Sequence, residues 1–409
     1  MALEALEATF PAGVSRRART EVTVSIGLER TVISRSLRSP PVRISPAHRE
    51  PCAALPGLPS GIYPYLGGSV SVADLRLVVG EYGYATVSGV GGVKLARQAG
   101  NTLADPVQYA PGLPGTAETH PELFGYDEWL ERQRLAQVPI ILTDSPRIRK
   151  RDREALRAAL GRWRSVAEPA LVVLPIEPWW LKGGLPCLID EVKSAQRPVA
   201  LVLLHHYNGL DEADAVAGLV AFMSAIDGLP VVLMRCDVSA VGAVAYGGFA
   251  GFVGLSSTNR HGPMPRRNPK RDGEEDDPDN SPSVFVPALH DYVKASKLPS
   301  ISRDEGASIL TCHDRACGGG SLLRLARLSE VDLAAARAQA YQHNLASQEN
   351  IAQSVFSSAE PKDAWWELCK SGADVTASLV ERGISLSASR WLRQWLELGS
   401  PSHEPVSVP

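Results

Sequence analysis

The 409-residue sequence lacks several features that would assign it to a protein class at once. It contains no run of 18 apolar residues, which argues against a transmembrane helix. It has no charged N-terminal region followed by an apolar stretch and a cleavage site, which argues against a secretory signal peptide. The formal net charge is only −3. No global basic field therefore draws the chain to nucleic acid, and any such contact needs a local patch.

Cysteine is also scarce, and its distribution excludes the disulfide framework of a small secreted domain. We expect a cytoplasmic protein, because the few thiols are spread over a long chain. In a reducing compartment, a close cysteine pair favours metal binding or chemistry over a disulfide. The six cysteines are Cys52, Cys187, Cys236, Cys312, Cys317 and Cys369.

What the sequence does contain is typical of a soluble globular protein, with 44% hydrophobic and 21% charged residues. From about residue 60, short apolar runs alternate with stretches of helical spacing, which indicates a parallel sheet covered by helices. Six or seven such units favour a (β/α)8 TIM-like barrel over a doubly wound sheet. No GxGxxG or P-loop follows any of the runs. The runs are ATVSGV, PIILTD, ALVVLPIE, VALVLLHHY, PVVLMRCD, GFVGLSS and SVFVPAL.

The composition divides the chain into four parts. Residues 1–57 form an N-terminal extension, partly strand or loop, and residues 58–305 form the barrel. Residues 306–355 follow as a helical subdomain, for which the cysteines and the histidine described below predict zinc binding, and residues 356–409 form C-terminal helices and a tail. Within the barrel, the insertion 263–283 is rich in charge, Pro, Asn and Ser and is expected to be mobile and solvated. Alternatively, its basic side chains contact phosphates: Arg266, Arg267, Lys270 and Arg271.

One group of side chains has the chemistry of a metal site. Cys312 and Cys317 lie in the segment LTCHDRACGGG, and His343 follows Cys317 after 25 intervening residues. Thiolate and imidazole are preferred zinc ligands, and a structural site needs four ligands in a tetrahedron. The fourth ligand would be Asp314 or His313. The alternative is a pair of buried or reactive thiols and an unrelated helix histidine.

The spacing of this group resembles the zinc motif Cys-x-Cys-x2-Cys-x25-His of the tRNA-guanine transglycosylase family. Here Asp314 stands in place of the middle cysteine, and His343 is followed by Asn and Leu as in the family. The segments PSGIYPYLGGSVSVADLRLVV, VPIILTDSP and VVLMRCDVSAVGAVAYGGFAGF resemble further family segments in the same order. The resemblance covers about residues 58–355.

The resemblance implies a (β/α)8 barrel with a zinc subdomain near the C-terminus. Enzymes of the family exchange a guanine in tRNA for a 7-deazaguanine base, and relatives do so in DNA. One aspartate attacks C1′ of the ribose and expels guanine, while a second aspartate handles protons, which is covalent catalysis with acid–base support. The zinc subdomain of the family also supports dimer contacts.

Carried over residue by residue, the resemblance makes Asp144 the proton-handling aspartate of the LTDS motif, at the end of a barrel strand. The alternative is that Asp144 caps a helix or turn. Glu177 lies near the position of the family's base-recognising aspartate, or else is a surface carboxylate. One of His205 and His206 would face the barrel mouth by alternation. We take His205 as base-binding; the alternative is a hydrogen-bonded structural histidine.

The nucleophile is the main departure from the family. In the family, the nucleophilic aspartate is the first residue of a segment Asp-x-x-x-Pro-Thr-Arg. In this sequence Gly254 occupies the position of that aspartate, and Arg260 matches the final arginine. Glycine cannot attack a ribose. Asp237, at the end of the preceding strand, is the nearest substitute, but it could equally cap the following helix.

Three hypotheses follow. The first is an active pentosyltransferase that uses Asp144 and Asp237 on tRNA or DNA with a 7-deazapurine base. The second is a non-catalytic subunit that binds nucleic acid or a purine base, as a homodimer or in a heterodimer with an active subunit. The third is an unrelated zinc-stabilised barrel. Basic side chains gathered on one face would favour a nucleic-acid partner.

Overall fold

A computed structural model describes residues 55–89, 91–107, 109–110, 126–226, 228–264, 279–302, 308–314, 316–386 and 389–400. The prediction of strand or loop for residues 1–57 falls almost wholly outside these ranges. So do most of the insertion 263–283 and its basic residues Arg266, Arg267, Lys270 and Arg271.

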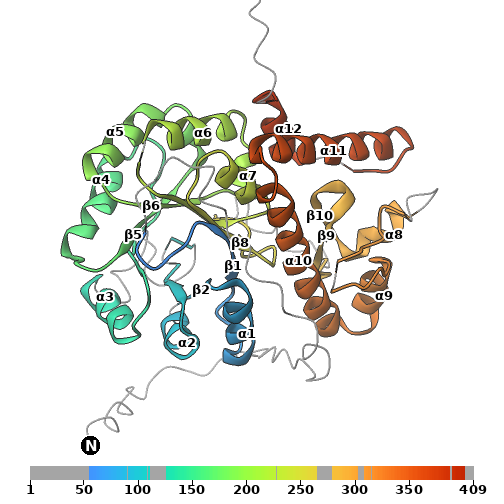
Figure 1. Cartoon of the computed structure of the whole chain (residues 1–409), viewed down its shortest axis with the longest axis horizontal. Coiled ribbons are helices and arrows are strands. Elements are labelled where there is room, and N and C mark those ends of the chain that lie inside the picture. The colour runs from blue at the N-terminus through green and yellow to red at the C-terminus, as the bar shows by residue number, and fades with distance from the viewer. Residues whose placement is uncertain are drawn as a thin grey trace, which may run out of the picture.

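Eight parallel strands form one sheet in the order β3-β2-β1-β8-β7-β6-β5-β4. The two strands at the ends of this order, β3 and β4, lie next to each other, so the sheet is a nearly closed barrel (Figure 1). The predicted TIM-like α/β architecture is confirmed at this level. The strands are β1 (Gly61–Leu66), β2 (Ala85–Ser88), β3 (Thr102–Asp105), β4 (Ile141–Leu142), β5 (Ala170–Ile176), β6 (Val199–Leu203), β7 (Val231–Cys236) and β8 (Ala250–Gly254).

The barrel strands are apolar along their length because both of their faces are buried. In β5, Val173 belongs to a cluster that fills the barrel, whereas its neighbours Val172 and Leu174 belong to the cluster between the sheet and the helices. Side chains alternate between the two faces of a strand, so a strand buried on both sides needs apolar residues at every position.

Helices follow most of the strands and surround the barrel (Figure 1). Ser71 caps α1 and Asp152 caps α4, each by accepting a hydrogen bond from a backbone N–H in the first turn. These helices are α1 (Val72–Tyr82), α2 (Gly92–Ala99), α3 (Tyr126–Leu135), α4 (Arg153–Gly161), α5 (Leu185–Ala195), α6 (Ala215–Ala225) and α7 (Ser239–Ala245).

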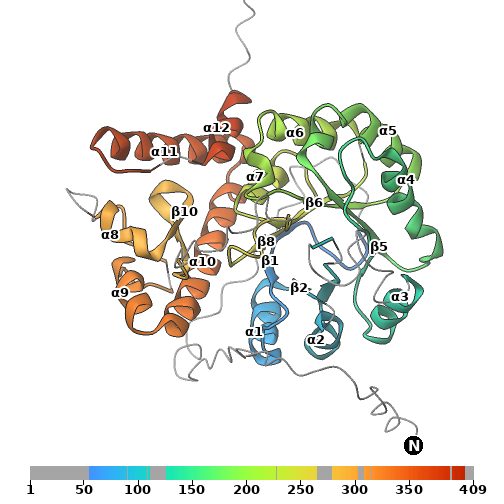
Figure 2. The ribbon, with the colours of Figure 1, turned by 180° about the vertical axis from the view of Figure 1, so that it is seen from behind.

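The helix α10 (Leu333–Phe356) completes this coat between α7 and α1, although it comes much later in the chain. Tyr341 and Leu345 pack against the cluster of β1, β2 and α1, and Val355 and Phe356 pack against the cluster that includes α7. Both ribbon views place α10 between the barrel and a smaller unit (Figures 1 and 2). One helix thus links the barrel to the C-terminal part.

The smaller unit contains an antiparallel pair of strands, β9 (Ser283–Val286) and β10 (Asp291–Lys294), together with α8 (Leu298–Ile301) and α9 (Leu323–Val331). The prediction that SVFVPAL is a strand of the parallel sheet is wrong. A continuous apolar run marks a strand buried on both faces, but it does not tell which sheet the strand joins. Here the run packs into a core that also holds Cys312 and Cys317.

Two further helices, α11 (Pro361–Glu381) and α12 (Arg390–Glu397), end the described chain. Trp365 of α11 stacks on Trp391 of α12, with ring centroids 5.9 Å apart, and both indoles are fully buried. Within the described residues, no helix combines the length and the apolar character needed to cross a bilayer.

Candidate metal centre and barrel mouth

Three buried side chains converge in the smaller unit: Cys312, Cys317 and His343. The Nδ1 atom of His343 lies 3.5 Å from Sγ of Cys312 and 3.2 Å from Sγ of Cys317. All three ligand atoms lie within 4.8 Å of one another. A tetrahedral zinc ion with Zn–S of about 2.3 Å and Zn–N of about 2.05 Å would separate sulfur and nitrogen by about 3.6 Å. The group therefore fits a metal ion without large movement.

The thiols come together because the chain folds back on itself between them. Thr311 pairs with Ser321, and the N–H of Cys312 donates to the carbonyl of Gly320 at 3.1 Å. Gly318 and Gly319 have φ angles of 58° and 81°, a region that residues with a Cβ rarely adopt. The three consecutive glycines of the sequence thus make the turn that presents both sulfurs to one side.

The histidine is oriented by a hydrogen bond on its other nitrogen. Nε2 of His343 lies 2.6 Å from the carbonyl oxygen of Phe285 in β9. A carbonyl only accepts, so Nε2 carries the proton and the lone pair of Nδ1 points at the two sulfurs. Metal-binding histidines are commonly held in this way.

The residues after His343 explain the His-Asn-Leu context. The side chain of Asn344 donates to the carbonyls of Leu255 and Ser283 and accepts from the N–H of Phe285. It therefore ties the end of β8 to β9. Leu345 packs on the barrel, so the tripeptide joins metal centre, strand pair and barrel.

Asp314 is closer to the centre than His313, the other predicted fourth ligand. Its Oδ2 lies 3.8 Å from Nδ1 of His343, and its carboxylate accepts hydrogen bonds from Ser347 and Asn350 of α10. The side chain of His313 is exposed. Contact between the two thiols raises the pKa of Cys312 and lowers that of Cys317. A bound cation would favour the thiolate form of both.

The predicted catalytic and base-binding residues are dispersed, in contrast, and most are paired. Asp144 is buried, and its Oδ2 lies 3.7 Å from a guanidinium nitrogen of Arg162, which directly follows α4. Glu177 forms an ion pair with Arg147 at 2.6 Å. His205 lies 3.3 Å from Glu212, and burial lowers the pKa of this histidine.

The carboxylate of Asp237 is held by hydrogen bonds beside the start of α7. Its Oδ1 accepts hydrogen bonds from the N–H and the hydroxyl of Ser239 at 2.9 and 2.5 Å, and its Oδ2 accepts from the amide of Asn208 at 2.5 Å. Burial raises the pKa of Asp237. The carboxylate thus accepts hydrogen bonds from the start of α7 and from the loop that holds Asn208.

Gly254 has no room for a side chain. A Cβ built there would lie 2.2 Å from the carbonyl carbon and oxygen of Asn259 and 2.5 Å from the N atom of Arg260. Non-bonded carbon atoms normally stay about 3.5–4.0 Å apart. The backbone of residues 259–260 therefore occupies the space in which the family's nucleophile would begin.

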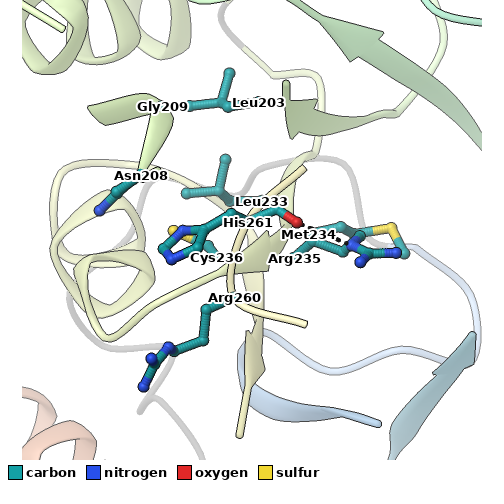
Figure 3. A pocket seen from close by; sticks show the side chains of 9 residues that line it. All are labelled: Leu203, Asn208, Gly209, Leu233, Met234, Arg235, Cys236, Arg260 and His261. Atoms are coloured by element: carbon teal, nitrogen blue, oxygen red, sulfur yellow. Dashed lines mark hydrogen bonds between the residues drawn. The ribbon is translucent and has the colours of Figure 1, made fainter. Parts of the chain in front are cut away.

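Arg260 lines a small cavity beside β7 and the C-terminal end of β6 (Figure 3). The cavity volume of about 10 Å³ leaves room for one water molecule but not for a purine base. The guanidinium of Arg260 stacks on the ring of Tyr292 at 3.5 Å, and within the described chain its Nη1 has no hydrogen-bond partner. Burial lowers the pKa of the neighbouring His261 to about 3, so this imidazole is neutral.

A buried polar network inside the barrel was not predicted. The hydroxyls of Tyr65 and Tyr109 donate to Asp105 at 2.6 and 2.5 Å, and the guanidinium of Arg235 lies 5.3 Å from the ring centroid of Tyr65. Burial raises the pKa of both tyrosines. The only sequence signal was the aspartate that ends the short segment TLAD. The network fills the barrel near the ends of β1, β3 and β7.

Comparison of the sequence with protein-family models gives no match, and comparison with curated proteins finds no similar sequence either. Any functional assignment therefore depends on the residues and the geometry described above.

Proposed function

We propose that this protein is a metal-stabilised barrel of the tRNA-guanine transglycosylase type that does not exchange bases and instead binds nucleic acid. In such a role it would act as a subunit, either in a homodimer or beside an active partner. The observation that carries the proposal is the packing around Gly254, which leaves no space for a nucleophile.

The state of the remaining carboxylates supports the loss of base exchange. A nucleophilic carboxylate needs a free oxygen aimed at the substrate. Both oxygens of Asp237 already accept hydrogen bonds from neighbouring side chains or backbone. Asp144 faces Arg162, and Glu177 faces Arg147. The cavity beside Arg260 is too small for a base.

We further propose that the metal is zinc, bound by Cys312, Cys317, His343 and Asp314. The donor set supports zinc because two thiolates and an imidazole exclude hard cations such as Mg²⁺ and Ca²⁺. Burial among apolar side chains supports a structural role. Zinc would fix the loop of residues 311–321 to α10, and the binding energy would stabilise the fold.

Purified full-length protein tests both statements. It is incubated with tRNA or DNA and radiolabelled guanine, and incorporation, nucleic-acid binding and metal content are measured on the same sample. The proposal predicts binding without incorporation, and about one zinc per chain, as a single four-ligand site requires. Incorporation that is lost in Asp237→Asn or Asp144→Asn would overturn the proposal in favour of an active transferase. A folded protein free of metal would overturn the zinc assignment.

A further inference from the structure

Asp314 lies in the turn between the two cysteines of the candidate metal centre, and hydrogen bonds fix its backbone there. Its N–H donates to Sγ of Cys312 at 3.4 Å. Its carbonyl oxygen accepts from the N–H groups of Cys317 and Gly318 at 2.8 and 2.9 Å. The turn therefore sets the position of the Cα atom, and only the side-chain torsions of Asp314 remain to be fixed.

Two side chains of α10 hold the carboxylate of Asp314. Its Oδ2 accepts a hydrogen bond from the hydroxyl of Ser347, and its Oδ1 accepts one from the amide of Asn350. An ionised carboxylate has about four acceptor sites on its two oxygens, so these two bonds leave room for a further partner.

The carboxylate also lies near the position that a metal ligand would take. Oδ2 of Asp314 is 3.8 Å from Nδ1 of His343. In a tetrahedral zinc site with Zn–N and Zn–O of about 2.1 Å, a ligand nitrogen and a ligand oxygen are about 3.4 Å apart. The observed separation is close to this value, so a small rotation of the side chain completes the geometry.

The side chains that reach this site from α10 lie on one face of the helix. Ser347 and Asn350 follow His343 by four and seven residues, or about one and two turns of an α-helix. One helix therefore presents a metal-binding imidazole and, beside it, two hydrogen-bond donors for a carboxylate. The loop that holds the cysteines meets α10 at all three side chains.

The stability of the helix does not explain these two residues. Asparagine is a poor helix former, yet Asn350 is exposed in the interior of α10. Ser347 has only 2% of its surface exposed. A serine inside a helix can bond to the carbonyl one turn earlier, but the hydroxyl of Ser347 donates to Asp314. Both side chains thus serve the contact with the loop.

A fourth ligand is what the candidate centre needs. Within the described ranges, the group whose ligand atoms all lie close together has three members, Cys312, Cys317 and His343, whereas a structural zinc site has four ligands. Carboxylates that bind a metal are themselves held by hydrogen bonds, and loss of such a partner typically lowers metal affinity about 10- to 100-fold.

We propose that Ser347 and Asn350 are positioning residues of the zinc site, which hold the carboxylate of Asp314 as the fourth ligand. The inference rests on the proposed function, from which it takes the metal and its four ligands. It adds that three side chains together fill the place of a third thiolate: one carboxylate that binds the ion and two donors that orient this carboxylate.

Competition for Zn²⁺ between the full-length protein and a chromophoric chelator tests the inference. The test variant carries Ser347→Ala and Asn350→Ala. The matched control carries Gln353→Ala and Ser354→Ala, which remove an amide and a hydroxyl from exposed positions of the same helix. Alanine has the highest helix propensity, so neither pair of substitutions weakens α10 locally.

The test variant is expected to bind Zn²⁺ at least about tenfold more weakly than the wild type. The control variant should bind like the wild type. Asn350→Ala alone changes an exposed side chain, leaves the core intact and should weaken binding about tenfold. Unchanged affinity in Asn350→Ala would remove this residue from the proposal.

A double-mutant cycle with Asp314→Ala separates positioning from a general structural role. Residues that act through a carboxylate lose their effect once the carboxylate is absent. In the Asp314→Ala background, the two substitutions in α10 should therefore change Zn²⁺ affinity by less than about twofold, the usual scatter of such cycles. An equal loss in both backgrounds would show that Ser347 and Asn350 act by another route, which overturns the inference.

The outcomes separate the inference from the proposed function. If the wild type binds Zn²⁺ and the test variant binds it equally well, the positioning role is wrong and the zinc assignment stands. If the control variant loses as much affinity as the test variant, the effect belongs to the helix as a whole and the inference is overturned. If the wild type binds no Zn²⁺, the zinc assignment itself fails.

Discussion

The candidate metal centre and the barrel mouth differ in how their polar side chains are arranged. In the metal centre, two thiols and an imidazole point at one another, and the nearest carboxylate lies 3.8 Å from the imidazole. In the barrel mouth, each expected functional carboxylate is engaged by a different basic or hydrogen-bonding partner. The first arrangement leaves donor atoms for a ligand, whereas in the second each carboxylate faces a partner from the chain itself.

Under the proposed function, this difference separates what stabilises the fold from what catalysis would need. A structural metal contributes to stability directly, so its ligands are needed whether or not the protein is an enzyme. A catalytic carboxylate is usually costly to stability because it must stay unpaired. In the proposed non-catalytic protein, the ion pair of Asp144 and the hydrogen bonds of Asp237 stabilise the barrel instead.

The largest effect is expected when one of the proposed metal ligands is removed. His343→Ala should abolish metal binding and lower the free energy of unfolding by about 5 kcal/mol or more, because the site also loses its link to β9. Metal analysis and denaturant unfolding check this. His313→Ala serves as the control and should change stability by less than about 0.5 kcal/mol. Loss of metal in His313→Ala would show that the ligand set is wrong.

The next largest effect tests whether the space around Gly254 is filled by backbone atoms. Gly254→Ala should destabilise the protein by about 3 kcal/mol, since the new Cβ meets backbone atoms that cannot move independently. Gly80→Ala, at an open position in α1, should stabilise it by up to about 1 kcal/mol. Thermal unfolding of both variants measures these changes in stability. A Gly254→Asp variant that folds normally and exchanges bases would contradict the account.

A smaller effect distinguishes a cap from a nucleophile. Asp237→Ala should cost about 1–2 kcal/mol because Ser239 and Asn208 lose their acceptor. Asp152→Ala, which removes the cap of α4, is the matched comparison and should cost about 1 kcal/mol. Both values come from denaturant titration. An Asp237→Ala protein as stable as the wild type would mean that these hydrogen bonds do not stabilise the start of α7.

The smallest effect concerns pH at the junction of the two regions. Burial raises the pKa of Asp291 in β10 to about 6. The folded state therefore holds this proton more tightly than the unfolded chain. Its contribution to stability is fully present below the unfolded pKa of about 3.9 and is lost as pH rises through about 6.

Asp291→Asn removes this dependence. Relative to the wild type, the variant should gain about 1 kcal/mol in unfolding free energy between about pH 5 and about pH 7.5. Melting temperatures of both proteins at the two pH values give the comparison. An equal difference at both values would show that Asp291 does not titrate in this range.

Much of the barrel could be predicted because its strands are buried on both faces and read as apolar runs. Two strands escaped this pattern. β1 contains Pro64, which lacks the N–H that a central strand normally uses, and β3 has the sequence TLAD, in which only two apolar residues stand together. The run at 283–289 was assigned to the wrong sheet because local composition does not encode the strand's partner.

The metal group was predictable because its ligands come from one short loop and one helix. The ion pairs and hydrogen bonds at the barrel mouth were not predictable, because they join residues far apart in sequence. Glu177 and Arg147 are 30 residues apart, and Asp237 and Asn208 are 29 apart. A sequence shows that a carboxylate is present, but whether it is free depends on such long-range partners.

The most direct test of the central claim is a search for a covalent protein–nucleic-acid adduct. Base exchange of the kind implied by the resemblance passes through a bond between an aspartate and C1′ of a ribose. Labelled tRNA and DNA are mixed with metal-containing protein, and each sample is divided between a native and a denaturing gel. We expect a shifted complex in the native gel and no labelled protein in the denaturing gel. A denaturation-resistant adduct that disappears in Asp237→Asn would contradict the account.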